Sequence, residues 1–463
     1  MNISNDTVFL NVKKLFNILE VDKAVFFGLL SKMWSFGAGP ITAILIAFKF
    51  TPQLQGYYYT FGTLLSLQVF VELGLGTVII QFASHEWSKL SLTNKGEING
   101  NSDALIRLGN LFMIGIKWYL IGALILFLGL SFGGIYFFTT SQNDSVKWVL
   151  PWLSLCLFTG LSISIVPIWS ILEGCNQVSK LYTYRFFQGL ITSISMWVAL
   201  FFGAELWTTS VSGIMTLIFG GIFIRQKYWN FFKSLIRNSI DGEQLTWRKD
   251  VLPMQWRIAV SWISGFLAFG IFTPVLFKYQ GSVIAGQMGM TWTVIGVISA
   301  LSAAWISPKV PRFGILIAQK KYIELDSFFW KVTKISITVS VIAGVIIGVI
   351  VYLLNYFNNP LTQRFASRML LPLPLSIFIL AQIISTLSTP FSAYLRAHKK
   401  EPLMVISLIY GVLIGLSTFI LGRYSSVLAV AIGYLVCNIL IIPFIFLIWH
   451  RYSIIWHTKT DSK

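Results

Sequence analysis

The chain of 463 residues is far more apolar than a soluble protein: 56% of its residues are hydrophobic and 11% are charged. Soluble domains contain roughly 45–50% apolar and about 25% charged residues, so this chain could not cover a surface exposed to water. A bilayer removes that difficulty, because apolar side chains satisfy positions that face lipid. The formal charge of +18 is spread over short segments between apolar runs. It is not gathered into one stripe, which argues against nucleic-acid binding.

A membrane-spanning helix needs about 20 mainly apolar residues. By that measure the sequence predicts an all-α integral membrane protein with about twelve transmembrane helices. Those of the first half are expected near 24–48, 54–84, 108–137, 148–172, 183–203 and 206–225. Those of the second half are expected near 254–277, 283–307, 329–355, 370–394, 402–422 and 425–449.

Lysine and arginine are distributed unequally between the two sides of these spans. Of the 35 basic residues, 27 fall on the side that holds both termini, six on the other side, and two inside spans. The positive-inside rule therefore predicts that both termini are cytoplasmic. Residues 1–23 lack the apolar core of a cleavable signal, so the first span is expected to be retained.

The longest polar segments, about 85–107 and 226–253, both lie on the predicted cytoplasmic side, and no extramembrane domain is expected. The second of them divides the spans six and six. The predicted organisation is a cytoplasmic segment (1–23), a six-helix bundle (24–225), a cytoplasmic linker (226–253), a second six-helix bundle (254–449) and a cytoplasmic tail (450–463).

The two halves also resemble each other weakly. Phe48-Lys49-Phe50 ends the first span and Phe277-Lys278-Tyr279 ends the seventh, with Gly56 and Gly286 following at similar distances. This order fits parallel repeats related by an axis along the membrane normal.

Three ionisable residues fall inside predicted spans, where a charge is costly and suggests a functional site. Lys32 lies nine residues beyond Lys23, and Lys117 lies ten residues beyond Arg107. At the helical rise these positions are about 13 and 15 Å deep, while Glu72 is roughly 20 Å from the cytoplasmic face. One interpretation is a polar cavity that attracts an anion with the two lysines and uses Glu72 to carry a proton. The alternatives are a Lys32–Glu72 pair that only fixes helix register, and a Lys117 side chain that reaches to the headgroups.

Two arginines near span entrances are further candidates for binding an anionic substrate. Arg257 follows Pro253 by about one turn, and Arg185 begins the fifth span. Guanidinium binds phosphate in a bidentate manner. The alternative for Arg257 is an ordinary interfacial anchor, and for Arg185 a bridge to Glu173 across the preceding turn.

Gly39-Pro40 interrupts the first span, and proline removes a helical hydrogen bond, so a hinge is a candidate role. The three cysteines and four histidines show no metal-ligand spacing, and no phosphate-binding loop of an ATPase occurs. The sequence therefore predicts no metal site, no cofactor and no enzyme, with an ion gradient or the membrane potential as the source of energy.

Several short stretches resemble bacterial polysaccharide exporters. They are Gln55-Gly56-Tyr57-Tyr58-Tyr59, Val71-Glu72-Leu73-Gly74-Leu75-Gly76, Gln81-Phe82-Ala83-Ser84-His85, and Leu172-Glu173-Gly174 with Arg185. These exporters belong to the multidrug/oligosaccharidyl-lipid/polysaccharide (MOP) exporter superfamily. The resemblance implies two six-helix bundles around a central cavity.

Within that superfamily, the flippases of O-antigen or capsular repeat units are the most similar. The resemblance implies a bacterial cytoplasmic (inner) membrane protein that moves undecaprenyl-diphosphate-linked oligosaccharide to the outer leaflet by alternating access, for O-antigen, lipopolysaccharide or capsule assembly. Lys32, Lys117, Arg185 and Arg257 would meet the diphosphate, and Glu72 would couple transport to an ion. The expected partners are the lipid-linked oligosaccharide, membrane lipids, a polysaccharide polymerase and a chain-length regulator.

Three other functions compete with the flippase. A cation-coupled multidrug exporter of the same superfamily would need acidic cavity residues, of which Glu72 is one. A polysaccharide polymerase or lipid-linked glycosyltransferase would need a sizeable outer loop, whereas the longest here, 356–369, carries only Arg364 and Arg368 as charged residues. A non-transporting scaffold for glycan assembly would leave the charges within the membrane unexplained.

Overall fold

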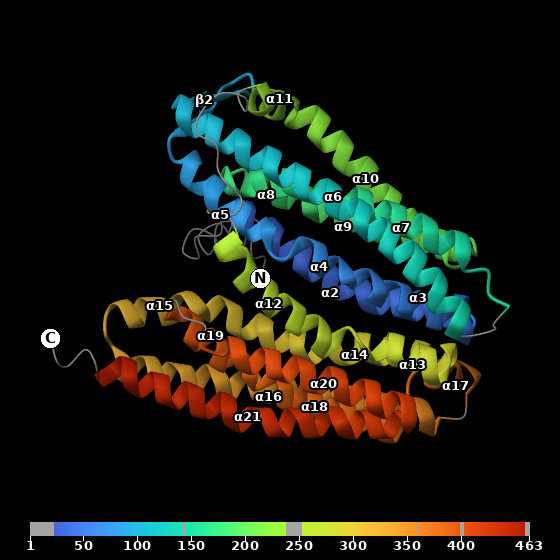
Figure 1. The fold of residues 1–463 in the computed structure, drawn as a ribbon. Coiled ribbons are helices and arrows are strands. Elements are labelled where there is room, and N and C mark those ends of the chain that lie inside the picture. The colour runs from blue at the N-terminus through green and yellow to red at the C-terminus, as the bar shows by residue number, and fades with distance from the viewer. Residues whose placement is uncertain (1–22, 142–144, 238–251, 358, 399–401, 459–463) are drawn as a thin grey trace, which may run out of the picture. The chain divides into compact units, whose positions relative to one another are not determined.

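The computed structural model describes residues 23–141, 145–237, 252–357, 359–398 and 402–458. Within these ranges the chain is almost entirely helical (Figure 1). Ten helices or joined helix pairs are long and apolar enough to cross a membrane, and the segments Pro52–Glu72 and Leu75–Trp87, bent by 45°, form an eleventh candidate. Every predicted span falls on helix in the described residues, including the 183–203 span, although the 54–84 span is interrupted at Leu73 and Gly74. The prediction of an all-α membrane fold with about twelve helices is confirmed.

The elements of the first half follow the predicted spans in order. They are α2 (Lys23–Lys49), α3 (Pro52–Leu65), η1 (Ser66–Gln68), α4 (Val69–Glu72), α5 (Leu75–Trp87), β1 (Leu90–Leu92), β2 (Ile98–Gly100), α6 (Ser102–Ser141), α7 (Val149–Ser164), α8 (Val166–Gly174), α9 (Val178–Phe201), α10 (Trp207–Lys227) and α11 (Trp229–Arg237).

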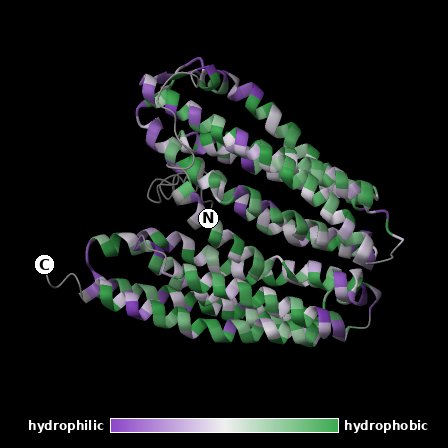
Figure 2. Cartoon of the chain, in the orientation of Figure 1, coloured by the Kyte–Doolittle hydropathy of each residue, from purple (hydrophilic) through white to green (hydrophobic). Residues whose placement is uncertain are grey.

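The second half is helical from Leu252 onward. Its elements are α12 (Leu252–Phe269), α13 (Phe272–Gln280), α14 (Ser282–Ile306), η3 (Ser307–Lys309), α15 (Val310–Ala318), α16 (Tyr322–Tyr356), α17 (Pro360–Ala366), α18 (Pro372–Thr386), α19 (Ser388–Ala397), α20 (Met404–Tyr424) and α21 (Val427–Thr458). Apolar residues run along the helices of both halves, and polar ones are concentrated near helix ends (Figure 2).

Contacts divide the chain into two compact units whose borders fall inside helices. The first unit comprises 1–42, 71–131 and 150–256, and the second comprises 43–70, 132–149 and 257–463. The border in α2 lies just after Pro40, although α2 continues through Gly39 and Pro40 as one helix. The Gly39-Pro40 hinge and the predicted linker at 226–253 both stay predictions. Residues 1–22, 238–251 and 459–463 of the predicted cytoplasmic segments lie outside the described residues.

The first unit is held together by close helix packing and an aromatic cluster. Gly174 of α8 lies against α5, where an added Cβ would be only 2.6 Å from the Cβ of Ala83. The Tyr184 ring of α9 stacks on Phe223 of α10 and on Trp169 of α8, with ring centroids 4.5 and 4.7 Å apart. Small residues and stacked rings therefore supply the van der Waals contact on which helix association in lipid depends.

A small cap on the first unit is formed by segments that the sequence indicates only as polar loops. Strands β1 and β2 form an antiparallel hairpin, and α11 packs beside it with Phe231 and Leu235 fully buried. The Ile98 N–H donates to the Ser234 hydroxyl (3.3 Å), and the Asn230 amide donates to the Lys95 carbonyl (2.9 Å). Two polar segments far apart in sequence are thus joined into one ordered structure.

In the second unit, α3 packs against α14 through the two glycines that the weak repeat places at corresponding positions. A Cβ on Gly56 would be 1.9 Å from the Ser282 carbonyl oxygen, and one on Gly286 would be 2.8 Å from the Gly56 nitrogen. Since a pseudo-twofold axis brings equivalent positions together, this contact fits the parallel repeat suggested by the sequence.

The connection between α2 and α3 is attached to the segment after α17. Gln55 is buried, and its amide donates to the carbonyls of Gly286 and Arg368, at 2.9 Å each. Arg368 is only 5% exposed, and its guanidinium donates to the Phe50 carbonyl and to Gln55 Oε1. A buried arginine thus binds a backbone oxygen of the α2–α3 connection and an amide oxygen in the first turn of α3.

Candidate functional site

Lys32 and Arg185, two of the predicted substrate-binding residues, line one cavity in the first unit. The cavity has a volume of about 350 Å³ and lies between α2 and α9. Gly28, Leu29, Ser31 and Lys32 come from α2, and Tyr182 and Arg185 come from α9. Residues three or four apart share one face of a helix, so Gly28 with Lys32 and Tyr182 with Arg185 form the two walls.

Arg185 is fixed by the neighbouring helix α8. Its Nη2 donates to Glu173 Oε2 at 2.8 Å, which confirms the predicted bridge across the α8–α9 turn. The Tyr182 hydroxyl donates to the other oxygen of Glu173 at 3.3 Å, and the guanidinium lies 5.4 Å from the centre of the Tyr182 ring. The carboxylate therefore holds both side chains of the α9 wall in place.

Glycine at position 28 makes room for the Tyr182 ring. A Cβ on Gly28 would lie 3.1 Å from Tyr182 Cδ2, tighter than ordinary contact. Neither residue is among those predicted from the sequence. The helical spacing could have indicated them, because Gly28 stands four residues before Lys32 and Tyr182 stands three residues before Arg185.

Two tryptophans join α2 to α9 further along the same pair of helices. Trp34 Nε1 donates to the Gly189 carbonyl at 3.2 Å and to the Ser193 hydroxyl at 3.3 Å. Trp197 Nε1 donates to the Thr42 hydroxyl at 2.8 Å. These bonds hold α2 and α9 together beyond the cavity.

The charge in this cavity is only partly compensated. Arg185 shares the Glu173 carboxylate, whereas Lys32 is exposed. Among the described residues, no carboxylate lies within ion-pair distance of Lys32, so the alternative of a Lys32–Glu72 pair is not observed. A cavity lined by two cations, of which Arg185 is paired with a carboxylate, suits an anion, because guanidinium and ammonium bind anions through charge-assisted hydrogen bonds.

Glu72 lies at an interruption of the second predicted span. The helix ends at Glu72, and Leu73 and Gly74 take left-handed backbone conformations, with φ of 42° and 73°, before α5 begins. Glycine adopts this conformation freely, whereas leucine does so at an energetic cost. Trp118 Nε1 donates to the Val71 carbonyl at 3.0 Å, so α6 satisfies a backbone oxygen freed by the break.

The other predicted site residues are not among those that line the α2–α9 cavity. Lys117 is exposed on α6, and Glu72 is half-buried on α4, where it interacts electrostatically with Tyr119. Arg257 lies in α12, and its side chain is outside the described part of the structure. Gly39 and Pro40 lie on α2, beyond the lining residues. Roles for these residues stay predictions.

No family model and no curated protein sequence matches the chain. Solved structures do match over nearly its whole length. A structure described as the inward-facing conformation of a multidrug resistance MATE family transporter of the MOP superfamily aligns with a TM-score of 0.65 at 13% identity, covering 94% of this chain and 98% of the other. The chain has the fold of MOP-superfamily transporters.

Two further structures align with the chain, a second MATE multidrug transporter and a lipid flippase. The MATE multidrug transporter DinF-BH, in complex with a ligand, aligns with a TM-score of 0.58 at 13% identity, covering 93% of this chain and 95% of the other. The lipid II flippase MurJ in an inward closed conformation aligns with a TM-score of 0.53 at 15% identity, covering 97% and 87%. Proteins described as multidrug transporters and as a lipid II flippase thus share this fold, and the fold alone does not assign a function.

Proposed function

We propose that this protein is a flippase that moves undecaprenyl-diphosphate-linked oligosaccharides from the cytoplasmic to the outer leaflet by alternating access, in the assembly of O-antigen or capsular polysaccharide. The observation that carries the proposal is the shared cavity of Lys32 and Arg185. A diphosphate is a compact dianion, and a partly uncompensated pair of cations attracts it. The similarity of the fold to a lipid II flippase supports the same substrate class.

The proposal includes the setting in which the protein works. Both termini are cytoplasmic and the membrane is the bacterial inner membrane, in accordance with the distribution of lysine and arginine. Glu72, at a helix interruption, is the proposed ion-coupling residue. A polysaccharide polymerase would receive the flipped repeat unit, and a chain-length regulator would act with the polymerase.

A cation-coupled multidrug exporter is the second candidate, because two of the similar structures are MATE transporters and one of them is in complex with a ligand. The charge of the α2–α9 cavity disfavours it, since Lys32 and Arg185 would repel a cationic drug. The two candidates therefore predict opposite effects of neutralising Lys32.

The test is a translocation assay with the full-length protein in proteoliposomes. Undecaprenyl-diphosphate-linked oligosaccharide carrying a nitrobenzoxadiazole label on the sugar is placed in the membrane, and dithionite reports the label that reaches the outer surface. The unmodified protein is expected to expose label, and Lys32→Ala with Arg185→Ala to slow that exposure at least tenfold. Lys331→Ala, which removes an exposed lysine of α16, serves as the control.

Equal translocation by protein-containing and empty liposomes would refute the flippase. Efflux of a cationic fluorescent dye from the same liposomes, unaffected or accelerated in Lys32→Ala, would establish the exporter instead. Equal rates for Lys331→Ala and the double variant would show that the cavity charge has no specific part in transport.

A further inference from the structure

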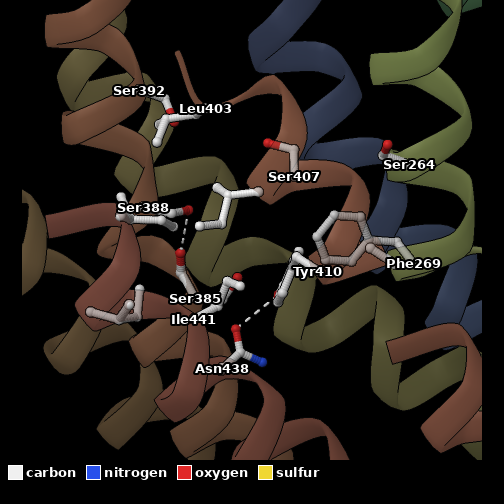
Figure 3. Close-up of a pocket in the computed structure, with 15 residues that line it drawn as sticks. Ser264, Phe269, Ser385, Ser388, Ser392, Leu403, Ser407, Tyr410, Asn438 and Ile441 are labelled. Atoms are coloured by element: carbon white, nitrogen blue, oxygen red, sulfur yellow. Dashed lines mark hydrogen bonds between the residues drawn. The ribbon is translucent and has the colours of Figure 1, made fainter. Parts of the chain in front are cut away.

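A second cavity, in the second unit, is lined by polar side chains that carry no charge. Its volume is about 210 Å³, and α12, α18, α19, α20 and α21 contribute to its wall. None of the described residues that line it is a lysine, arginine, histidine, aspartate or glutamate. Its hydroxyl groups belong to Ser264, Ser385, Ser388, Ser392, Ser407 and Tyr410, several of which are shown in Figure 3.

A buried hydrogen-bond network holds one wall of this cavity in place. The Tyr410 hydroxyl donates to Asn438 Oδ1 at 2.8 Å, and Asn438, which is fully buried, donates to the Tyr434 carbonyl at 2.8 Å (Figure 3 shows the first bond). The Tyr434 hydroxyl in turn donates to Gln382 Oε1 at 3.1 Å. Satisfied networks of this kind rigidify a core, so Tyr410 is oriented before any ligand arrives.

The remaining hydroxyls offer both donors and acceptors. The Ser264 hydroxyl donates to the Val260 carbonyl at 2.7 Å, and Ser388 donates to the Ser385 carbonyl at 2.8 Å, which leaves lone pairs on both hydroxyls to accept further bonds. Ser392 and Ser407 also line the cavity, and a serine hydroxyl can both donate and accept hydrogen bonds. The polar side of the cavity thus suits a ligand whose groups are themselves hydroxyls.

The residues that line this cavity favour some classes of ligand over others. A phosphate would need a cation here, and an inorganic cation is usually bound by carboxylates; the described lining residues supply neither. Apolar side chains also line the cavity, among them Ile441, which is buried, and Phe269, which is 42% exposed. A sugar ring combines an apolar C–H face with a rim of hydroxyls, and one such ring suits the volume of this cavity.

We propose that this cavity binds a single uncharged sugar unit of the transported glycan. The inference rests on the proposed flippase function and deepens it: the first unit recognises the diphosphate, and the second recognises a sugar. The ligand is a neutral hexose or N-acetylhexosamine, bound through hydroxyl groups of α19 and α20.

The test uses the purified full-length protein and saturation-transfer difference NMR with methyl glycosides of glucose, galactose, mannose and N-acetylglucosamine. At least one glycoside is expected to bind, and Ser392→Ala with Ser407→Ala to weaken it about tenfold or more, because each lost neutral hydrogen bond weakens binding roughly three- to tenfold. Tyr410→Phe is expected to weaken binding severalfold without removing the ring. Ser376→Ala, an exposed serine of α18 outside the cavity, should bind as the unmodified protein does.

Two outcomes would overturn the inference while leaving the flippase intact. One is that inorganic pyrophosphate binds in a Lys32-dependent manner but no glycoside binds. The other is that a glycoside binds equally to the unmodified protein and to the Ser392/Ser407 double variant. If the glycoside binds as expected while pyrophosphate does not, the sugar site stands and the diphosphate part of the proposed function fails.

Discussion

Replacing Arg368 by methionine should destabilise the second unit, because it removes the donors for two oxygens of the α2–α3 connection. Arg368 is 5% exposed and donates to the Phe50 carbonyl and to Gln55 Oε1. Methionine keeps the apolar stem of the side chain but offers no donor. Both acceptors would then be left with fewer partners.

The expected loss is about 2–4 kcal/mol in the free energy of unfolding. Each hydrogen bond to a charged group contributes about 1.5–3 kcal/mol to stability. Removing the guanidinium also removes the free-energy cost of desolvating it, which offsets part of the loss. At about 2 °C per kcal/mol for a large domain, the melting temperature should fall by about 4–8 °C. Cys156, Cys175 and Cys437 are free and buried, so a thiol-reactive fluorogenic dye can report unfolding of the purified protein.

Two comparisons make this prediction specific. Arg423→Met, which removes an exposed arginine that contacts only aromatic rings among the described residues, should change the melting temperature by less than about 2 °C. Gln55→Leu combined with Arg368→Met should cost less than the sum of the two single changes, because the residues share hydrogen bonds. A melting temperature of Arg368→Met within about 1 °C of the unmodified protein would refute the reasoning.

Three further predictions follow from the same structure. Gly56→Ala should destabilise the protein by about 1–3 kcal/mol, because the added methyl group clashes with α14. Gly62→Ala, on the same helix but in open space, should stabilise it by up to about 1 kcal/mol. Thermal unfolding that shows the same sign for both variants would contradict the packing. Lys32→Ala should weaken the binding of inorganic pyrophosphate about three- to tenfold in calorimetry, and Lys331→Ala, which removes an exposed lysine of α16, should leave it unchanged; equal losses would show that Lys32 has no specific part in binding the anion. Glu72→Gln should abolish the dependence of translocation on a proton gradient without changing pyrophosphate affinity, and a gradient dependence that persists would exclude Glu72 as the coupling group.

The helices could be predicted because a bilayer imposes a length and an apolar composition that are readable residue by residue. The break within the second span could not. Residues 54–84 are predicted as one helix, but Leu73 and Gly74 interrupt it with left-handed conformations. Residues 54–84 contain no proline, and glycines such as Gly74 and Gly76 in an apolar run are a weak signal for a break.

Only some of the residues that line the α2–α9 cavity could be predicted from the sequence. The depth of Lys32 and the position of Arg185 follow from counting along each helix, yet the cavity exists because α2 and α9 are neighbours. That pairing joins residues more than 150 positions apart through Trp34 and Trp197, and no local pattern encodes it. The same limit applies to the hairpin and α11, whose packing depends on contacts such as Asn230 with Lys95.

The predicted spans of the second half contain few charged residues. This agrees with a chemical difference between the two cavities. The cationic cavity belongs to the first unit and the neutral hydroxyl cavity to the second. A lipid-linked oligosaccharide carries a diphosphate that is costly to desolvate and sugars that need many weak, uncharged hydrogen bonds. If one cavity bound both the diphosphate and the sugars, the acceptors that the sugar hydroxyls require would partly neutralise the cations that bind the diphosphate. Separate cavities avoid that conflict, and they let the charged site be shared by substrates that differ only in their sugars. Under the proposed flippase function, the hydroxyls of α19 and α20 would set specificity for the glycan, and the cations of α2 and α9 would set affinity for the common diphosphate.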